Sequence, residues 1–212
     1  MIFTKGFILI FLLTLLAHQS AEAQATDSSE AAITNTTLLE NSSMTIKGSS
    51  TLHGWTVEAT DFSVQFSIPN NWFQSDDNWN GSDIDTLAVT VPVEHLDGGR
   101  NKMNRDLREA LRFEAHPQIR FTWDEIGFTG QTGIGKSATV TGSVTVAGVQ
   151  REIEFGTDIR LNEWNQIVAK GSVTMNMTDY NIEPPTALFG VIRTDEKIEL
   201  MFELYFEKEN QG

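Results

Sequence analysis

The sequence predicts an all-β protein, an antiparallel barrel or sandwich of about eight strands with one short amphipathic helix. Three observations predict it: apolar and polar residues alternate in seven segments, a glycine-containing turn joins two of them, and a single segment has helical periodicity. The chain has 212 residues and no cysteine, so neither disulfides nor a thiolate metal site contribute to the fold.

Residues 1–23 have the pattern of a secretory signal peptide. Lys5 precedes an apolar run, Gly6–Ala17, which is too short to span a bilayer, and Ala21-Glu22-Ala23 is a cleavage site of the A-x-A type. We expect a mature chain that begins at Gln24 and is periplasmic or secreted. An uncleaved membrane anchor is the less favoured alternative, and we expect no integral membrane protein.

The rest of the chain reads as one domain with polar ends. Residues 24–42 are rich in Ser, Thr and Ala without clear periodicity, which predicts a mobile leader. The barrel domain is predicted over residues 43–207, and residues 208–212 form a polar tail.

The strands follow in order along this domain. Alternation is clear in seven segments: 62–68, 87–93, 119–124, 139–146, 152–159, 173–178 and 198–206. Two further segments, 43–47 and 53–60, alternate less regularly. Val146–Val149 predicts a tight hairpin turn, because glycine tolerates positive φ. If the sheet closes, the apolar faces converge on one interior. Small inward residues favour a cavity there, although alternation alone also fits a packed core.

The segment 101–113 is the exception to the strand pattern. Met103, Leu107, Ala110 and Leu111 recur at helical spacing and form one face of an amphipathic helix. Pro117 prevents the helix from continuing further.

Gly130–Ser137 matches the phosphate-binding pattern G-x-x-x-x-G-K-[ST] at every position. That chemistry needs a helix directly after the loop, whose N-terminal amides hold the phosphates. Residues 138–146 alternate with a period of two instead, so we expect a glycine-rich hairpin loop and no nucleotide.

Other sequence features point away from catalysis and from polyanions. The formal charge of −14 argues against binding nucleic acid and against docking on anionic lipid headgroups. The mature histidines, His53, His95 and His116, have no metal-ligand spacing, and no nucleophile motif is present. We therefore expect no catalytic residues, no metal site and no enzyme activity.

Two segments contain polar or aromatic side chains for which the sequence leaves two roles open. His53 lies in a turn of small residues before Trp55, where it fits either a polar ligand head or a bond to loop backbone. The loop 70–85 contains Trp72, Phe73 and Trp79, which either fold over a barrel mouth or form an exposed recognition patch.

Five segments in this order resemble the YceI-like family, exported proteins with a lipocalin-like barrel. The similar segments are Ile46–Trp55, Val91–Gly99 with Met103-Asn104 after it, His116–Phe121, Val140–Val149 and Asp179–Pro185. The resemblance covers about residues 43–207. It implies a closed antiparallel lipocalin-like barrel around an elongated apolar tunnel that holds a polyisoprenoid or another long-chain amphiphile, with the polar head near the mouth.

The function expected from these observations is an exported binding protein for a long-chain amphiphile, used in transport, storage or sequestration. The expected ligand is a lipid and no cofactor is expected; a homodimer is left open. Inward-facing strand residues would line the tunnel: Val89, Val91, Phe121, Trp123, Val144, Phe155, Met175, Phe202 and Leu204. His53, Trp55 and Tyr180 would lie at the polar mouth. The alternative is a secreted interaction module with a packed core and a Trp-rich contact loop.

Overall fold

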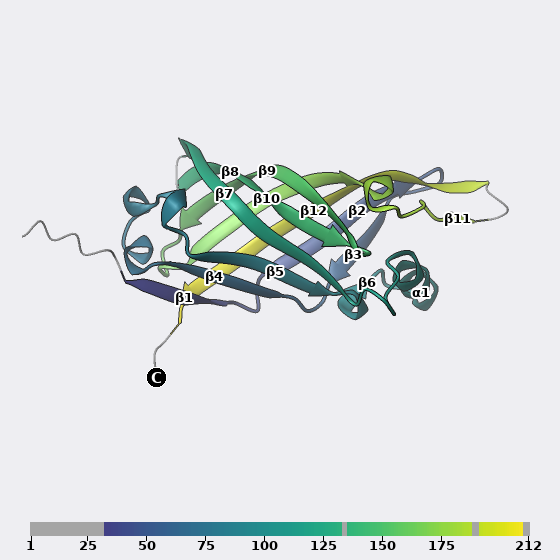
Figure 1. Cartoon of the computed structure of the whole chain (residues 1–212), viewed down its shortest axis with the longest axis horizontal. Coiled ribbons are helices and arrows are strands. Elements are labelled where there is room, and N and C mark those ends of the chain that lie inside the picture. The colour runs from purple at the N-terminus through teal and green to yellow at the C-terminus, as the bar shows by residue number, and fades with distance from the viewer. Residues whose placement is uncertain (1–31, 133–134, 188–190, 210–212) are drawn as a thin grey trace, which may run out of the picture. The chain divides into compact units, whose positions relative to one another are not determined.

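Eight antiparallel strands close into a barrel in this structure, a computed structural model that describes residues 32–132, 135–187 and 191–209 (Figure 1). The strand order is β1-β4-β5-β7-β8-β9-β10-β12, and pairing of β1 with β12 closes the ring. The strands are β1 (Ile33–Leu38), β4 (Ser63–Pro69), β5 (Thr86–Pro92), β7 (Gln118–Thr132), β8 (Gly135–Val146), β9 (Val149–Leu161), β10 (Ile167–Asn176) and β12 (Ile192–Lys208). The predicted barrel is confirmed.

The wall continues past β1 because β12 is 17 residues long and has two partners on one edge. Leu38 of β1 lies opposite Phe206, whereas Met44 of the following strand lies opposite Phe202. Three further strands extend the sheet from this edge of β12: β2 (Ser43–Ser50), β3 (Trp55–Ala59) and β6 (Leu96–Asp97). A last strand, β11 (Thr186–Ala187), pairs with the start of β12.

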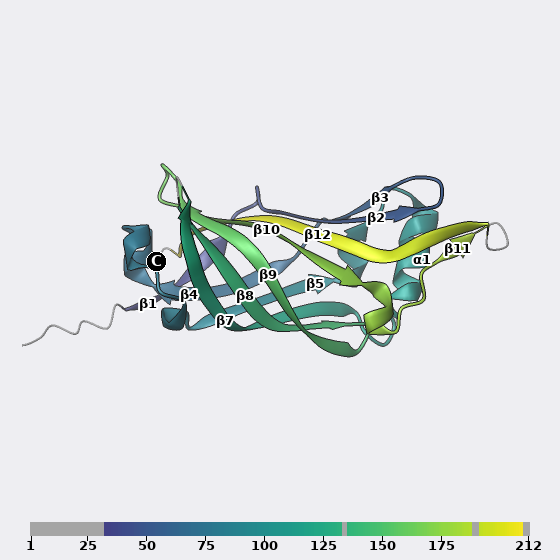
Figure 2. The ribbon, with the colours of Figure 1, turned by 90° about the horizontal axis from the view of Figure 1, so that it is seen from above.

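The predicted amphipathic helix is confirmed as α1 (Asn101–Ala110). It ends earlier than the sequence pattern, because the chain turns at Arg112, whose φ is 56°. Both views place α1, the β2–β3 turn and the β11–β12 hairpin at the same end of the barrel (Figures 1 and 2). Five short 3₁₀ helices complete the described structure: η1 (Asn70–Phe73), η2 (Asp76–Asn78), η3 (Gly81–Asp83), η4 (Val93–His95) and η5 (Met177–Tyr180).

The fold begins earlier than the predicted leader allows. Residues 33–38 of the segment 24–42 form β1, whose pairing is needed to close the barrel. The sequence of β1 does not alternate between apolar and polar residues, because its inward positions are threonines: Thr34 is 6 % exposed, and the Thr36 hydroxyl donates to the Phe66 carbonyl at 2.9 Å. The backbone carbonyl satisfies this hydroxyl, so threonine occupies an inward position at little cost.

The glycine-containing turn behaves as predicted. Val146 and Val149 are paired, and the two residues between them, Ala147 and Gly148, have φ of 49° and 82°. Two consecutive positive φ values define the type I′ hairpin turn, whose twist matches that of the strands. The described part of the segment 130–137 lies on two paired strands and not on a helix, with Gly130 paired to Ser137 and Thr132 to Gly135; residues 133–134 lie outside the described residues.

The predictions for the two chain ends fall mainly outside the described residues. The predicted signal peptide, 1–23, lies wholly outside them. In the predicted tail, β12 includes Lys208, and residues 210–212 lie outside. Within the described ranges, no helix has the length and apolar character needed to cross a membrane.

Candidate functional site

An apolar cavity of about 590 Å³ lies inside the barrel. At one end its wall includes Ile167 and Phe206, which are 0 % and 2 % exposed. At the other end its wall includes Leu52, which is 67 % exposed, and Lys102, which is also exposed. The cavity is therefore closed at the first end and opens between the β2–β3 turn and α1.

Eight of the nine side chains predicted to line a tunnel lie on the cavity wall: Val89, Val91, Phe121, Val144, Phe155, Met175, Phe202 and Leu204. Each lies in a regular stretch of strand, where side chains two apart share a face. Helix α1 adds Met103 and Leu107 to the wall, which the sequence analysis found as an amphipathic face but did not assign to the cavity.

Trp123 is the exception and does not line the cavity. It is half-buried against the hydrophobic cluster at the closed end. Trp123 is paired with Gly142, directly before a shift in the register of β7 between Trp123 and Glu125. After the shift, Ile126 takes the inward position and contributes to the wall.

Three phenylalanine rings on the cavity wall contact one another. Phe155 of β9 lies 5.8 Å from Phe121 of β7 and 5.8 Å from Phe202 of β12, and both pairs have edge-to-face geometry. These contacts fix the three rings relative to one another, so that side chains from three strands form one aromatic area of the cavity wall. Gly142 of β8 leaves room for this arrangement, since a Cβ there would lie 2.6 Å from the Phe121 ring.

The tryptophan-rich loop closes the far end of the barrel. Trp72 and Trp79 are 0 % and 4 % exposed, and their rings stack with centroids 5.5 Å apart. Phe73 is partly buried against the same cluster, and η1–η3 lie at the end opposite α1 (Figure 1). The alternative of an exposed contact patch made by Trp72, Phe73 and Trp79 is therefore wrong, because the two indoles are packed inside.

The three residues predicted for the polar mouth all lie on the cavity wall. His53 Nδ1 donates to the Gly54 carbonyl at 2.9 Å, so the backbone bond that the sequence analysis gave as one alternative is observed. Trp55 Nε1 donates to the Ser49 carbonyl at 3.2 Å, and its ring lies over Gly48, where a Cβ would be 2.1 Å away. The β2–β3 turn therefore depends on glycine at that position.

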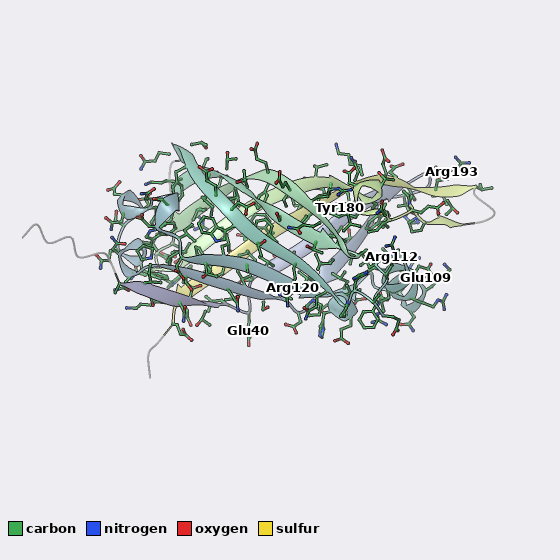
Figure 3. The ribbon with its side chains drawn as sticks, viewed as in Figure 1. Glu40, Glu109, Arg112, Arg120, Tyr180 and Arg193 are labelled. Carbon is green, nitrogen blue, oxygen red and sulfur yellow. The ribbon has the colours of Figure 1, made fainter. Side chains whose placement is uncertain are left out.

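Tyr180 completes this end of the cavity from η5. Its side chain is 4 % exposed, its hydroxyl donates to the Met175 sulfur at 3.6 Å, and burial together with the nearby Asp179 raises its pKa. Arg112, after α1, donates to the Asn181 carbonyl at 2.9 Å and so ties the helix end to η5 (Figure 3). Tyr180 consequently supplies a neutral hydroxyl near the opening.

Among the residues that the structure describes, the charged side chains on the cavity wall come from α1 and the residue before it. Arg100, Lys102 and Asp106 lie on the wall at the opening, and Lys102 pairs with Asp106 one helical turn away. Among the described residues, no group of three metal-ligating side chains is present. His95 instead lies 3.7 Å from the carboxylate of Asp61.

The fold and its interior define a lipocalin-like barrel with an apolar cavity that opens at one end. A model of the YceI-like domain matches residues 26–206, and the chain belongs to the YceI-like family. The comparison with curated proteins gave no match.

Solved structures share this fold at low sequence identity. BcnA of Burkholderia cenocepacia has a TM-score of 0.61 and 15 % identity, covering 77 % of this chain and 95 % of that one. A polyisoprenoid-binding domain from Saccharophagus degradans, implicated in plant cell wall breakdown, has a TM-score of 0.59 and 13 % identity, with coverage of 83 % and 99 %. The YceI protein of Campylobacter jejuni has a TM-score of 0.54 and 15 % identity, with coverage of 73 % and 85 %.

Proposed function

We propose that this chain is an exported, periplasmic or secreted carrier that holds a long-chain amphiphile, a polyisoprenoid or a similar lipid, for transport, storage or sequestration. The observation that carries the proposal is the cavity of about 590 Å³, lined mainly by apolar side chains and open at one end. Cavities of this size are typical of small-molecule sites. The proposal assigns a binding role and no catalytic residue.

The chemistry of the wall favours a long apolar chain over a compact polar ligand. Burying one methylene group contributes roughly 0.8 kcal/mol, so a tail of a dozen carbons contributes roughly 10 kcal/mol before ordering costs. Micromolar affinity corresponds to roughly 8 kcal/mol, and the tail supplies most of it when the ordering cost is about 4 kcal/mol.

The orientation of the ligand follows from the distribution of polar groups. His53, Tyr180 and Arg100 lie near the open end, whereas the closed end is made of Trp72 and the residues packed on it. A polar head therefore belongs at the opening and the tail in the interior. The family and the neighbouring polyisoprenoid-binding domain support the same class of ligand.

Titration with a fluorescent fatty-acid or polyprenol probe tests the proposal. Val173, on the cavity wall and 6 % exposed, is replaced in Val173→Trp to fill the interior. We expect probe affinity to fall at least about tenfold, because the indole occupies the volume that the tail needs.

Thr174→Trp is the matched control, since the next residue of β10 faces outward and is exposed. It should bind the probe as the parent protein does. Equal affinity for the probe in the Val173→Trp variant and its parent would place the binding site elsewhere and contradict the proposal.

A further inference from the structure

Two exposed apolar side chains lie at the open end of the barrel. Leu52, in the β2–β3 turn, is 67 % exposed, and Val191, before β12, is 73 % exposed. The two turns are joined by hydrogen bonds, from the Thr51 amide to the Arg193 carbonyl at 3.0 Å and from the Thr51 hydroxyl to the Val191 carbonyl at 3.5 Å. Leu52 and Val191 are therefore held on adjacent tips, although exposure of such side chains to water is unfavourable.

Positive charge is concentrated beside these tips. The segment 100–112, which contains α1, has five basic and two acidic side chains, a formal charge of +3. The remainder of the chain then has a formal charge of −17. Arg112, Glu109 and Arg193 lie at the end with α1 and β11, whereas Glu40 and Arg120 lie along the barrel (Figure 3). This asymmetry favours one orientation of the barrel near a negatively charged surface.

Acidic groups near the tips have hydrogen-bonding partners within the protein. Asp195 accepts a hydrogen bond from the Ser49 hydroxyl, and Glu196 accepts one from the Thr178 hydroxyl at 3.2 Å. Because these two carboxylates repel an anionic surface, electrostatic attraction alone does not account for binding at this end. The apolar side chains Leu52 and Val191 must therefore contribute part of the binding energy. A surface that is both apolar and negatively charged fits this combination best.

We propose that the open end docks on a lipid bilayer that contains anionic lipid. Leu52 and Val191 enter the interface, and the basic segment 100–112 lies against the headgroups. The cavity opening then faces the bilayer, so that an apolar cargo passes between membrane and barrel without crossing water. The net charge of the whole chain argued against such docking, but the segment 100–112 beside the opening has a formal charge of the opposite sign.

Co-sedimentation with phosphatidylcholine vesicles, with and without phosphatidylglycerol, tests the proposal. We expect more binding with phosphatidylglycerol and a decrease with added salt. Leu52→Asp and Val191→Asp should each reduce the bound fraction about tenfold, because each puts a charge where an apolar side chain enters the interface.

Ile33→Asp and Trp164→Asp are the matched controls, with parent exposures of 48 % and 70 %. Ile33 pairs with Pro69 just before η1, and Trp164 lies in the β9–β10 turn beside Ile167, both at the closed end. These variants should bind vesicles as the parent does. Absence of vesicle binding by the parent, or equal losses in the controls, would overturn the proposal.

The vesicle experiment needs no cargo, so its outcome is independent of the proposed carrier function. A separate measurement of probe uptake from solution distinguishes the two. Val191 is not on the cavity wall, so Val191→Asp should take up the probe at the parent's affinity while losing vesicle binding. Loss of both together would indicate damage to the fold or cavity and would count against docking through this tip.

Discussion

The indole nitrogen of Trp79 donates a hydrogen bond to the backbone carbonyl of Trp72 at 2.9 Å, and the two rings stack. This pair lies in the buried hydrophobic cluster at the end of the barrel opposite α1. The rings of Phe66 and Phe128 pack on Trp72, with ring centroids 6.4 and 5.9 Å from it. The stacked pair Trp72 and Trp79, called the plug below, is therefore packed against strands β4 and β7 of the barrel wall.

The hydrogen bond between the two tryptophans should stabilise the closed end measurably. Trp79→Phe keeps most of the ring but leaves the buried Trp72 carbonyl without this donor, at an expected cost of about 1–3 kcal/mol in the free energy of unfolding. Urea denaturation measures it. Trp164→Phe, at a site 70 % exposed, should change stability by less than about 0.5 kcal/mol. If Trp79→Phe and Trp164→Phe lowered the free energy of unfolding equally, the hydrogen bond between the two tryptophans would contribute no measurable stability.

The loop before α1 depends on one asparagine. Asn104 Nδ2 donates to Asp97 at 2.8 Å, and its Oδ1 accepts from the Gly98 amide at 2.7 Å. Hydrogen bonds from Asn104 and then the Gly99 amide lower the pKa of Asp97. Asn104→Ala should raise the pKa of Asp97 towards its ordinary value and speed amide exchange in α1, both measured by NMR. Asn101→Ala, on an exposed position of the helix, should do neither.

The β8–β9 hairpin has no room for a side chain at Gly148. Its φ is 82°, and a Cβ would lie 2.5 Å from the His116 ring. Gly148→Ala should therefore destabilise the protein by about 2 kcal/mol, partly from the backbone and partly from the contact. In the double variant with His116→Ala, thermal unfolding should recover the contact part only. No recovery would mean that backbone strain alone accounts for the loss.

Glu203, on the outer face of β12, makes the stability of the protein depend on pH in a predictable direction. The Tyr205 hydroxyl, at 2.8 Å, and then Lys170 lower the pKa of Glu203 in the folded state. A lowered folded-state pKa stabilises the protein above the ordinary glutamate pKa, and this stabilisation is lost as pH falls towards the lowered value. The stability difference between the parent and Glu203→Gln should be present at pH 7 and shrink in acid. Glu199→Gln, exposed on the same strand, should show a smaller pH-dependent difference.

Alternation predicted the barrel because most strands are regular and have an apolar inner face, and eight of the nine side chains assigned to the interior lie on the cavity wall. It failed where another residue type replaces the pattern, as at Thr34 and Thr36 of β1, whose inward side chains are polar. It also did not predict the shift in the register of β7 after Trp123, which changes the face of the residues that follow and makes Ile126 a buried residue.

The closed end was beyond single-sequence reasoning for a different reason. The loop 70–85 is polar on average, yet Trp72 and Trp79 are buried by contacts with β4, directly before the loop, and with β7, far along the chain. Nothing in local periodicity distinguishes such a plug from an exposed aromatic patch. The three 3₁₀ helices that hold it, η1–η3, are also too short to leave a periodic signal.

Native mass spectrometry of the purified chain, before and after extraction with organic solvent, tests the central claim most directly. The account predicts one noncovalently bound long-chain amphiphile per barrel, lost on extraction and restored when a polyprenol or fatty acid is added. A chain that carries no apolar molecule and takes up none of the added lipids would contradict the carrier function.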